Sequence, residues 1–515
     1  MPTLVALYCV DISSYAKDFL IKDKSAIEMS IENALTLPDC KKVLIIINKK
    51  DEVLFNSLKD EGKLDDRIEV RTFDVVSSYN ILRECSKDSD VYSDVFIHPL
   101  DAPFIDVEES QILYERHIKY SAEYSFADGF PQFLLPQILS VSLCRILSRF
   151  AEKDLGDAHH NFLFELIKKD INSYDIETLV APEDVRILKL SFIVDSKRSL
   201  MLCKNFFGIN TKNYLEMIKS SPLMLKTLPR YYMIEICPKT PYTPIYRPPL
   251  VEDAKIMSLE EFSIIIEKIS RFSDDAIISL SLYGEPLEHP QFVEIVKKSL
   301  SYNNISLLIE THGNKKEWQE KLDAIKEVIL TSPIRPSLTQ PLYWITSIDA
   351  TKWETYGKVY NVEEEEAKLL LKTAYEMAEQ ASSIFGSSSY VQIVRMLENE
   401  DDLEDFYRSW KERGVEVIIQ KYNHFCKALP DRRVADLSPL KRMPCRHLNR
   451  EVCINYNGDV LLCYQDIFSK NVLGNVLREE LEDIWQRFDA PFVEQANLKF
   501  GDLCELCDEY YTYNF

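Results

Sequence analysis

Cys445-x12-Gly458-x4-Cys463 is followed, after residues 464–503, by Cys504-Glu-Leu-Cys507. The turn of a Cys-x-x-Cys segment directs both sulfurs toward one metal centre. The dipeptide Asn457-Gly458 is a strong signal for a β-hairpin, with Cys463 just beyond it. Four thiolates suit either an iron–sulfur cluster or a structural zinc ion. These cysteines therefore predict a small metal-binding domain over residues 440–515.

Other residues in this region extend the pattern beyond the cysteines. They form the segments Ile454-Asn-Tyr-Asn-Gly-Asp-Val460, Asp466, Leu473-Gly-Asn475 and Leu481-Glu-Asp-Ile-Trp485. With the cysteines they resemble the SPASM domain, an auxiliary iron–sulfur domain of many radical S-adenosylmethionine enzymes. The full family motif has further cysteines and two clusters, so the resemblance here implies a truncated version with one 4Fe–4S cluster. Its ligands would be Cys445, Cys463, Cys504 and Cys507, with Cys453 as a spare, buried thiol.

Composition limits the partners and the compartment. The chain has 515 residues, and its 83 acidic and 61 basic residues give a net charge of −22. This excess disfavours a nucleic-acid interface and docking on an anionic membrane. The N-terminal apolar stretch is a poor signal peptide, and no apolar run reaches the ~18 residues of a membrane span. We therefore expect a cytoplasmic protein, where clustered cysteines indicate metal rather than disulfides.

Residues 225–430 alternate apolar runs with helical patterns, which is typical of a parallel barrel or partial barrel. The first strand, Tyr231–Ile236, runs into an irregular loop, because the five prolines between Pro238 and Pro249 exclude helix and central strand. The other strands are expected at Ala276–Leu282, Ile305–Ile309, Ala324–Leu330, Tyr343–Ile348, Tyr390–Met396 and Val415–Ile419.

Distinctive residues stand at three of these strand ends: Leu280-Ser-Leu-Tyr-Gly-Glu-Pro-Leu287, Glu310-Thr-His-Gly313 and Ser347-Ile-Asp349. They resemble motifs of the radical S-adenosylmethionine barrel. The resemblance implies a residual cofactor site at Gly284, Glu285 and Pro286, although Glu285 as a cap at a strand end is the alternative.

The same family places Cys-x3-Cys-x2-Cys in the loop after the first strand. Aligning the first strands puts those three positions on Thr240, Pro244 and Arg247, none of which is a thiolate. Cys237 alone cannot hold a cluster. We therefore expect the chain to have the barrel fold of this family without its radical chemistry.

Residues 1–215 show a βαβ rhythm, with short β-branched strands at Val43–Ile47 and Val95–Ile97. A further α/β domain is expected. Asp101 follows the second of these strands, where carboxylates often bind a metal–phosphate group, and Asp195 could share a Mg²⁺ ion with it. A helix N-cap or turn is the alternative role for Asp101.

Three segments carry a family resemblance in this domain: Leu100-Asp-Ala-Pro103, Ala122–Gly129 and Ile193-Val-Asp195. They resemble the glycosyltransferase A-type nucleotidyltransferases, especially the sugar cytidylyltransferases. However, Tyr8–Ser14 lacks the glycines and cations of that family's phosphate loop, and Pro131–Gln137 lacks its usual glycine and acid. Intact transfer activity is therefore not expected.

The combination of the three domains resembles the spiro-SPASM proteins of spirochaetes, and it leads to three hypotheses. The preferred one is an iron–sulfur protein without radical chemistry, which binds an unidentified substrate or protein partner or transfers electrons. The second is a nucleotide-sugar enzyme acting through Asp101 and Asp195. The third is an atypical radical enzyme whose second cluster is anchored without the usual cysteines.

Overall fold

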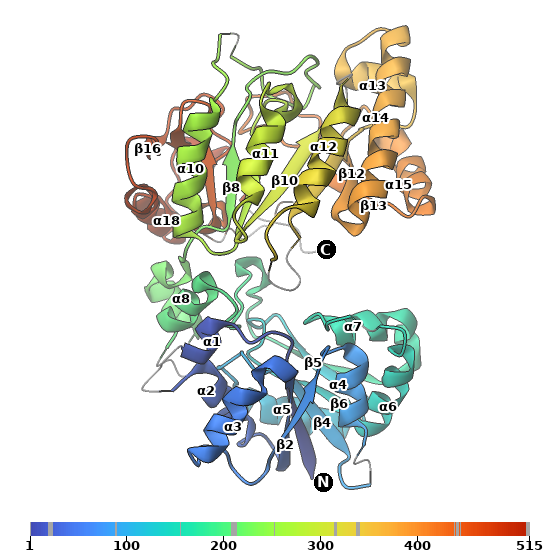
Figure 1. The fold of residues 1–515 in the computed structure, drawn as a ribbon, viewed down its shortest axis with the longest axis vertical. Helices are drawn as coiled ribbons and strands as arrows, with labels where there is room; N and C mark the ends of the chain where they lie inside the picture. Colours follow the sequence, from blue (N-terminus) through green and yellow to red (C-terminus); the bar gives the residue numbers. More distant parts are fainter. Residues whose placement is uncertain are drawn as a thin grey trace. The chain divides into compact units, whose positions relative to one another are not determined.

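The protein is described by a computed structural model that divides into two compact units, Met1–Leu225 and Lys226–Phe515 (Figure 1). The structure describes residues 2–18, 24–87, 90–154, 156–207, 214–251, 253–313, 317–335, 340–436, 438, 442 and 444–510. The predicted N-terminal domain, residues 1–215, lies within the first unit, and its boundary stays a prediction. The second contains both the predicted barrel and the cysteine-rich region, whose separate boundaries at 225–430 and 440–515 stay a prediction.

The first unit is built on a seven-stranded mixed sheet in the order β3-β2-β1-β4-β6-β5-β7. Its strands are β1 (Thr3–Cys9), β2 (Cys40–Asn48), β3 (Ile68–Phe73), β4 (Asp94–Pro99), β5 (Tyr124–Asp128), β6 (Gln137–Ser140) and β7 (Ile176–Val180). The helices are α1 (Ser14–Asp18), α2 (Ala26–Ala34), α3 (Glu52–Asp60), α4 (Ser78–Cys85), α5 (Val107–Lys119), α6 (Val141–Phe150), α7 (Phe162–Ile167), α8 (Lys197–Asn205) and α9 (Tyr214–Ser220).

The two short apolar runs of this unit are strands, as predicted. Val43–Ile47 lies in β2 and Val95–Ile97 in β4, and both strands pair in parallel with the buried β1. Parallel strands need crossover helices, which cover the sheet and bury these runs on both faces. The α/β class predicted for this unit is confirmed.

The second unit contains a nine-stranded sheet in the order β13-β12-β11-β10-β9-β8-β14-β15-β16. The strands are β8 (Tyr231–Ile234), β9 (Ala276–Ser279), β10 (Ile305–Thr311), β11 (Leu342–Ser347), β12 (Ser389–Arg395), β13 (Glu416–Lys421), β14 (Glu451–Ile454), β15 (Asp459–Leu461) and β16 (Val472–Asn475). The helices are α10 (Leu259–Phe272), α11 (Phe292–Leu300), α12 (Trp318–Leu330), α13 (Trp353–Tyr360), α14 (Glu364–Phe385), α15 (Leu403–Glu412), α16 (His447–Arg450), α17 (Leu481–Gln486), α18 (Asp489–Ala496) and α19 (Asp502–Glu505).

Strands β8 to β13 are all parallel and form the partial barrel, with α10, α11 and α12 side by side on one face (Figure 1). The sheet does not stop at β8. Strand β14, from the cysteine-rich region, pairs with β8 in parallel and continues into the antiparallel strands β15 and β16. The cysteine-rich region is thereby attached to the barrel by backbone hydrogen bonds.

One predicted strand is wrong. Ala324–Leu330 lies in helix α12, so the partial barrel has six parallel strands among the described residues rather than seven. The buried side chains of α12 are Trp318, Leu322 and Ile325, which recur at helical spacing. Charged residues between them face solvent, and this period of three to four is a helix signal rather than a strand signal.

In the described part of the chain, no helix is both long and apolar enough to cross a membrane.

Candidate metal centre

The four predicted ligands come from short elements around one end of the β14–β15 hairpin. Cys445 precedes α16, Cys463 follows β15, Cys504 lies in α19, and Cys507 comes two residues after that helix. The hairpin turn is organised by Asn455, whose Oδ1 accepts the backbone N–H groups of Asn457 (2.9 Å) and Asp459 (3.0 Å).

Gly458 completes the turn at φ +81°, a conformation that glycine adopts without strain. The predicted hairpin at Asn457-Gly458 is therefore confirmed, and it leads the chain directly to Cys463.

All four thiols line a single pocket. Cys445, Cys463, Cys504 and Cys507 share its wall with Gln465, Gln495 and other residues. Among the residues that the structure describes, no three His, Cys, Asp or Glu side chains form a ready-made site for a metal ion. The shared pocket is the geometric basis for considering the four cysteines together.

Hydrogen-bond donors point at the sulfurs. Gln495 is buried and uses both ends of its amide: Oε1 accepts the backbone N–H of Cys445 at 3.1 Å, and Nε2 donates to Cys504 Sγ at 3.1 Å. The backbone N–H of Glu509 donates to Cys507 Sγ at 3.2 Å. Such donors stabilise thiolates and tune the potential of thiolate-bound clusters.

Two cationic side chains also line the pocket. The Arg442 guanidinium lies between the rings of Phe500 and Tyr510, 4.0 and 4.2 Å from their centroids, and donates to the Cys504 carbonyl at 2.9 Å. Burial acts to lower the pKa of His447, but the charge and hydrogen bond of Glu451, 2.6 Å away, outweigh it and raise the pKa to about 9. Four thiolates around iron would carry net negative charge; Arg442 would offset part of it, whereas the charge of His447 is balanced by Glu451.

These residues fit a thiolate-bound cluster. Burial raises the pKa of Cys445, Cys463 and Cys504, so these thiols ionise readily only when a metal stabilises the thiolate. The pocket supplies N–H donors and positive charge to the same sulfurs, which is the environment that bound thiolates require.

A fifth cysteine lies next to one residue of the pocket wall and was missed by the sequence reasoning. Cys426, in the loop after β13, has its Sγ 3.8 Å from Oε1 of Gln465, a residue of the pocket wall. In the sequence it stands isolated, without a Cys-x-x-Cys partner. Only its position shortly before Cys445 could have drawn attention to it.

The other two cysteines of the second unit are packed. Cys453 lies in β14 among Met233 and Leu461 and is 2% exposed. Cys237 is also 2% exposed, in the proline-rich loop. Burial raises the pKa of both thiols.

The residues of the expected S-adenosylmethionine site are engaged within the protein. Both oxygens of the buried Glu285 accept backbone N–H groups, Oε1 from Leu287 and Oε2 from His312, each at 3.1 Å. Pro286 is buried next to it. Glu285 is thus the N-cap of a short 3₁₀ helix, which matches the alternative role considered for it.

Arg247 contacts the segment around Gly284 directly. It stands at the last of the three positions that align with the cluster cysteines of radical S-adenosylmethionine enzymes. Its Nη1 donates to the carbonyls of Tyr283 (2.7 Å) and Gly284 (3.0 Å), and its Nη2 lies 3.4 Å from Glu310. A guanidinium therefore binds the Gly-Glu-Pro segment from the loop in which the family carries its cluster cysteines.

In the first unit, Asp101 lies two residues beyond β4, and one of its carboxylate oxygens is buried without a hydrogen-bond partner. Asp195 is exposed and does not end a strand, but the chain before it is tied to Asp101 by the Val194 N–H, 2.9 Å from the Asp101 carbonyl. Burial, and then the charge of Asp195, raise the pKa of Asp101 to about 7. The two predicted carboxylates are therefore neighbours.

Sequence comparisons identify relatives of this chain. An uncharacterized protein of Treponema pallidum (strain Nichols) is 42% identical over 361 residues, which cover 69% of this chain and 99% of the relative. A second uncharacterized protein of the same organism is 29% identical over 165 residues, covering 29% of this chain and 71% of its own length.

Solved structures give more distant similarities. BtrN in complex with AdoMet and 2-DOIA is 16% identical and aligns over 56% of this chain and 99% of its own, with a TM-score of 0.35. Streptococcus suis SuiB bound to its precursor peptide SuiA is 13% identical and aligns over 72% and 85%, with a TM-score of 0.41. A cytidylyltransferase from Leptospira borgpetersenii is 12% identical and aligns over 44% and 95%, with a TM-score of 0.36.

The cysteine-rich region also matches a family model. Residues 445–508 match SPASM, an iron–sulfur cluster-binding domain, and this range contains all four predicted ligands. The chain thus has a SPASM domain and belongs to the same family as the Treponema pallidum protein with which it shares 42% identity.

Proposed function

We propose that this is an iron–sulfur protein of the spiro-SPASM type, in which Cys445, Cys463, Cys504 and Cys507 hold one 4Fe–4S cluster. The observation that carries the proposal is the single pocket lined by all four thiols, with Gln495 and the Glu509 backbone donating to two of the sulfurs. The family match over residues 445–508 supports iron–sulfur over a structural zinc ion.

A bound cluster would supply one-electron transfer or a rigid, charged binding surface. The protein's part is to hold the thiolates, to donate hydrogen bonds to them and to offset their charge. At Cys504, Gln495 donates a hydrogen bond to the sulfur, and the Arg442 guanidinium, bound to the Cys504 carbonyl, offsets negative charge. We infer a role in binding or electron transfer, with the substrate or protein partner still to be identified.

The barrel is proposed to carry no radical chemistry. Thr240, Pro244 and Arg247 replace the cysteines that the family aligns there. Arg247 also donates to the carbonyls of Tyr283 and Gly284, so the motif that would contact S-adenosylmethionine is already hydrogen-bonded within the chain.

The proposal is tested by reducing the anaerobically purified protein with dithionite in the presence of S-adenosylmethionine. We expect a paramagnetic signal from one reduced cluster and no release of 5′-deoxyadenosine. Substituting Cys445→Ser together with Cys463→Ser should abolish the signal. Release of 5′-deoxyadenosine by the wild-type protein would contradict the proposal and favour an atypical radical enzyme.

The first unit supports a second candidate function, a Mg²⁺-dependent nucleotide site. The supporting observation is the unpartnered, buried oxygen of Asp101 beside Asp195. The nearby lysines, however, are paired with acids: Lys17 with Asp51 at 2.7 Å and Lys50 with Asp11 at 2.8 Å. We therefore place this candidate second.

Calorimetry with CTP and Mg²⁺ tests it. If the site exists, Asp101→Asn should weaken binding by at least about tenfold, because one metal-binding carboxylate is lost. Asp170→Asn, at an exposed residue that pairs with Ser173, is the control and should leave binding unchanged. Absence of Mg²⁺-dependent binding by the wild-type protein would exclude a CTP site in this unit.

A further inference from the structure

We propose that the barrel sets the reduction potential of the cluster through two positioning residues, Tyr283 and Asp508. This inference rests on the proposed 4Fe–4S cluster. Tyr283 is hydrogen-bonded to the residue that follows Cys463, and Asp508 itself follows Cys507. Each of the two residues therefore connects the barrel to a segment that carries a proposed ligand.

Tyr283 joins the Gly-Glu-Pro segment of the barrel to the chain after Cys463. Its hydroxyl donates to the backbone carbonyl of Tyr464 at 2.7 Å, while its own carbonyl accepts from Arg247 Nη1, also at 2.7 Å. Tyr283 is 8% exposed, and in such a buried environment a carbonyl without a partner is costly. Loss of the Tyr283 hydroxyl would therefore leave a carbonyl dipole uncompensated one residue from a ligand.

Tyr464 extends this connection to Cys507. Its hydroxyl donates to Glu509 Oε2 at 3.3 Å, and the His447 ring lies edge-on to its own ring, with 5.1 Å between the centroids. The backbone N–H of Glu509 in turn donates to Cys507 Sγ at 3.2 Å. The residue that Tyr283 holds thus follows one proposed ligand in the sequence and contacts the residue that donates to another.

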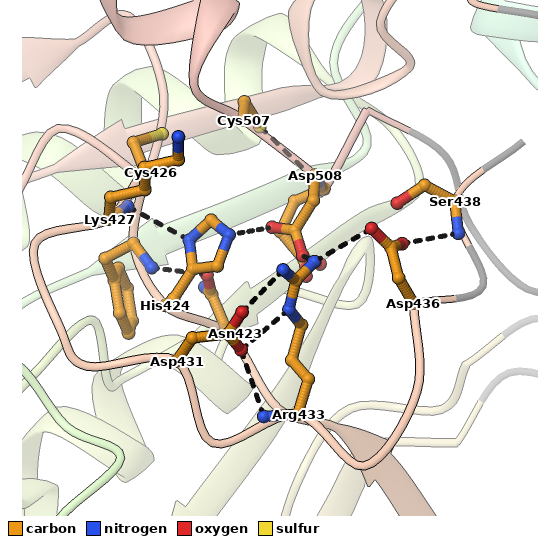
Figure 2. A network of polar contacts seen from close by, with 12 residues as sticks. Asn423, His424, Cys426, Lys427, Asp431, Arg433, Asp436, Ser438, Cys507 and Asp508 are labelled. Carbon is orange, nitrogen blue, oxygen red and sulfur yellow. Dashed lines mark hydrogen bonds and ion pairs between the residues drawn. The ribbon is translucent and has the colours of Figure 1, made fainter. Parts of the chain in front are cut away.

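Asp508 joins the segment of Cys507 to the last strand of the barrel and to the chain beyond it (Figure 2). Its Oδ2 accepts from Lys421 Nζ, in β13, at 2.8 Å and from Arg433 Nη1 at 3.1 Å. The side chains of Lys421 and Asp508 are only 14% and 10% exposed. Ion pairs buried to this degree are weakly screened by salt, so they hold Asp508, and with it Cys507, against the barrel.

The loop after β13 contacts both positioning residues. Phe425 packs edge-on against the Tyr283 ring, with 6.1 Å between the centroids, and His424 Nε2 lies 3.4 Å from Asp508 Oδ1. The other ring nitrogen of His424 accepts the Lys427 N–H at 3.0 Å, so Nε2 carries the ring proton and directs it toward Asp508 (Figure 2). Two neighbouring residues of one loop therefore link Tyr283 to Asp508.

The conformation of this loop shows that it is firmly held. Phe425, Cys426 and Lys427 have φ values of +47°, +53° and +68°, three consecutive left-handed residues that are not glycine. This conformation is costly for residues with a Cβ atom, so such a run persists only where its surroundings enforce it. The contacts with Tyr283 and Asp508 help to enforce it here, which makes the loop a stiff link between them.

The two residues act on the cluster with opposite sign. Reduction adds negative charge to the cluster, so a carbonyl dipole that has lost its Tyr283 donor opposes it. The Asp508 carboxylate is itself negative, and its removal favours reduction. Opposite shifts of the potential distinguish this electrostatic role from a general loosening of the protein.

The experiment is an anaerobic redox titration of the full chain, followed by electron paramagnetic resonance. Tyr283→Phe should decrease, and Asp508→Asn increase, the equilibrium constant for reduction by about threefold, a shift of roughly 30 mV for a one-electron couple. Tyr407→Phe removes an exposed hydroxyl in α15, and Asp431→Asn removes an exposed carboxylate that also binds Arg433. These two controls should stay close to the wild-type potential.

The proposal is overturned if Tyr283→Phe or Asp508→Asn keeps its iron and titrates at the wild-type potential, or if the controls shift as far as these variants. Should a variant lose its iron, the unfolding midpoint of the metal-free protein decides. An unchanged midpoint supports a positioning role, because only the ligand has moved, whereas a lowered midpoint indicates a folding role and overturns the proposal. A wild-type protein without iron and sulfide would instead defeat the proposed cluster itself.

Discussion

Gly284 lies against the backbone of the proline-rich loop. A Cβ atom at this position would come within 2.0 Å of the carbonyl oxygen of Cys237. Because a backbone atom cannot move aside as a flexible side chain does, Gly284→Ala should lower the free energy of unfolding by about 3 kcal/mol or more. Guanidinium unfolding measures this. Gly501→Ala, whose new Cβ would meet nothing within 4 Å, should change the free energy by less than about 0.5 kcal/mol. Equal midpoints for the two variants would contradict the close contact.

Asp349 is fully buried in the barrel and accepts hydrogen bonds from Tyr246 Oη (2.7 Å), Tyr360 Oη (3.1 Å) and the Val394 N–H (2.8 Å). Burial raises the pKa of Asp349 to about 6. In the unfolded chain an aspartate titrates near ~3.9, so between these values the folded state keeps a proton that the unfolded state has lost. Stability is therefore lost as the pH rises toward the folded pKa.

This titration predicts that the pH dependence of stability differs between the wild type and Asp349→Asn, because asparagine has no charge to bury. Between about pH 4.5 and pH 7.5 the wild type should lose about 2 kcal/mol of unfolding free energy relative to this variant. Urea unfolding at both pH values provides the measurement. Parallel pH profiles for the two proteins would show that Asp349 does not carry the effect.

At the scale of elements, Arg247 helps attach the proline-rich loop to the segment after β9, together with the Glu285 N–H, which donates to the Lys239 carbonyl at 2.8 Å. Replacing Arg247 by Met removes the donors to the carbonyls of Tyr283 and Gly284. Two buried carbonyls would lose a charged partner, so the free energy of unfolding should fall by about 3 kcal/mol. Chemical unfolding checks this against Arg271→Met, on the exposed end of α10, which should remain within about 0.5 kcal/mol of wild type.

The elements themselves were predictable where apolar runs are short and β-branched. Ile305–Ile309 and Tyr390–Met396 coincide with β10 and β12, since parallel strands are buried on both faces. Ala324–Leu330 was misread because its last three residues, Val328–Leu330, are consecutive and apolar like a strand. The helical pattern is visible only when the residues before this segment are included, because Trp318, Leu322 and Ile325 face the core at helical spacing.

At the scale of the whole molecule, part of the candidate site follows from the sequence. The spacing of Cys445 and Cys463 around a glycine turn predicts their association with the Cys-x-x-Cys pair, and the structure places all four at one pocket. Their role as ligands stays a prediction. The approach of Cys426 to Gln465, a residue of the pocket wall, could not be found in this way, because it depends on how the loop after β13 packs in three dimensions.

The pairing of β14 with β8 could not be predicted from the sequence either. The two strands are separated by the whole barrel, and nothing local in Glu451–Ile454 specifies its partner. This pairing makes the barrel and the SPASM domain parts of one sheet.

The most direct test of the central claim is iron and acid-labile sulfide content after anaerobic purification, for the wild type and for Cys445→Ser/Cys463→Ser. The account predicts about four irons and about four sulfides per wild-type chain, lost in the double variant. About eight irons, half of them surviving the substitutions, would mean that the barrel holds a cluster of its own and would contradict the account. Zinc without sulfide would contradict it as well, because the four cysteines would then bind a structural zinc ion.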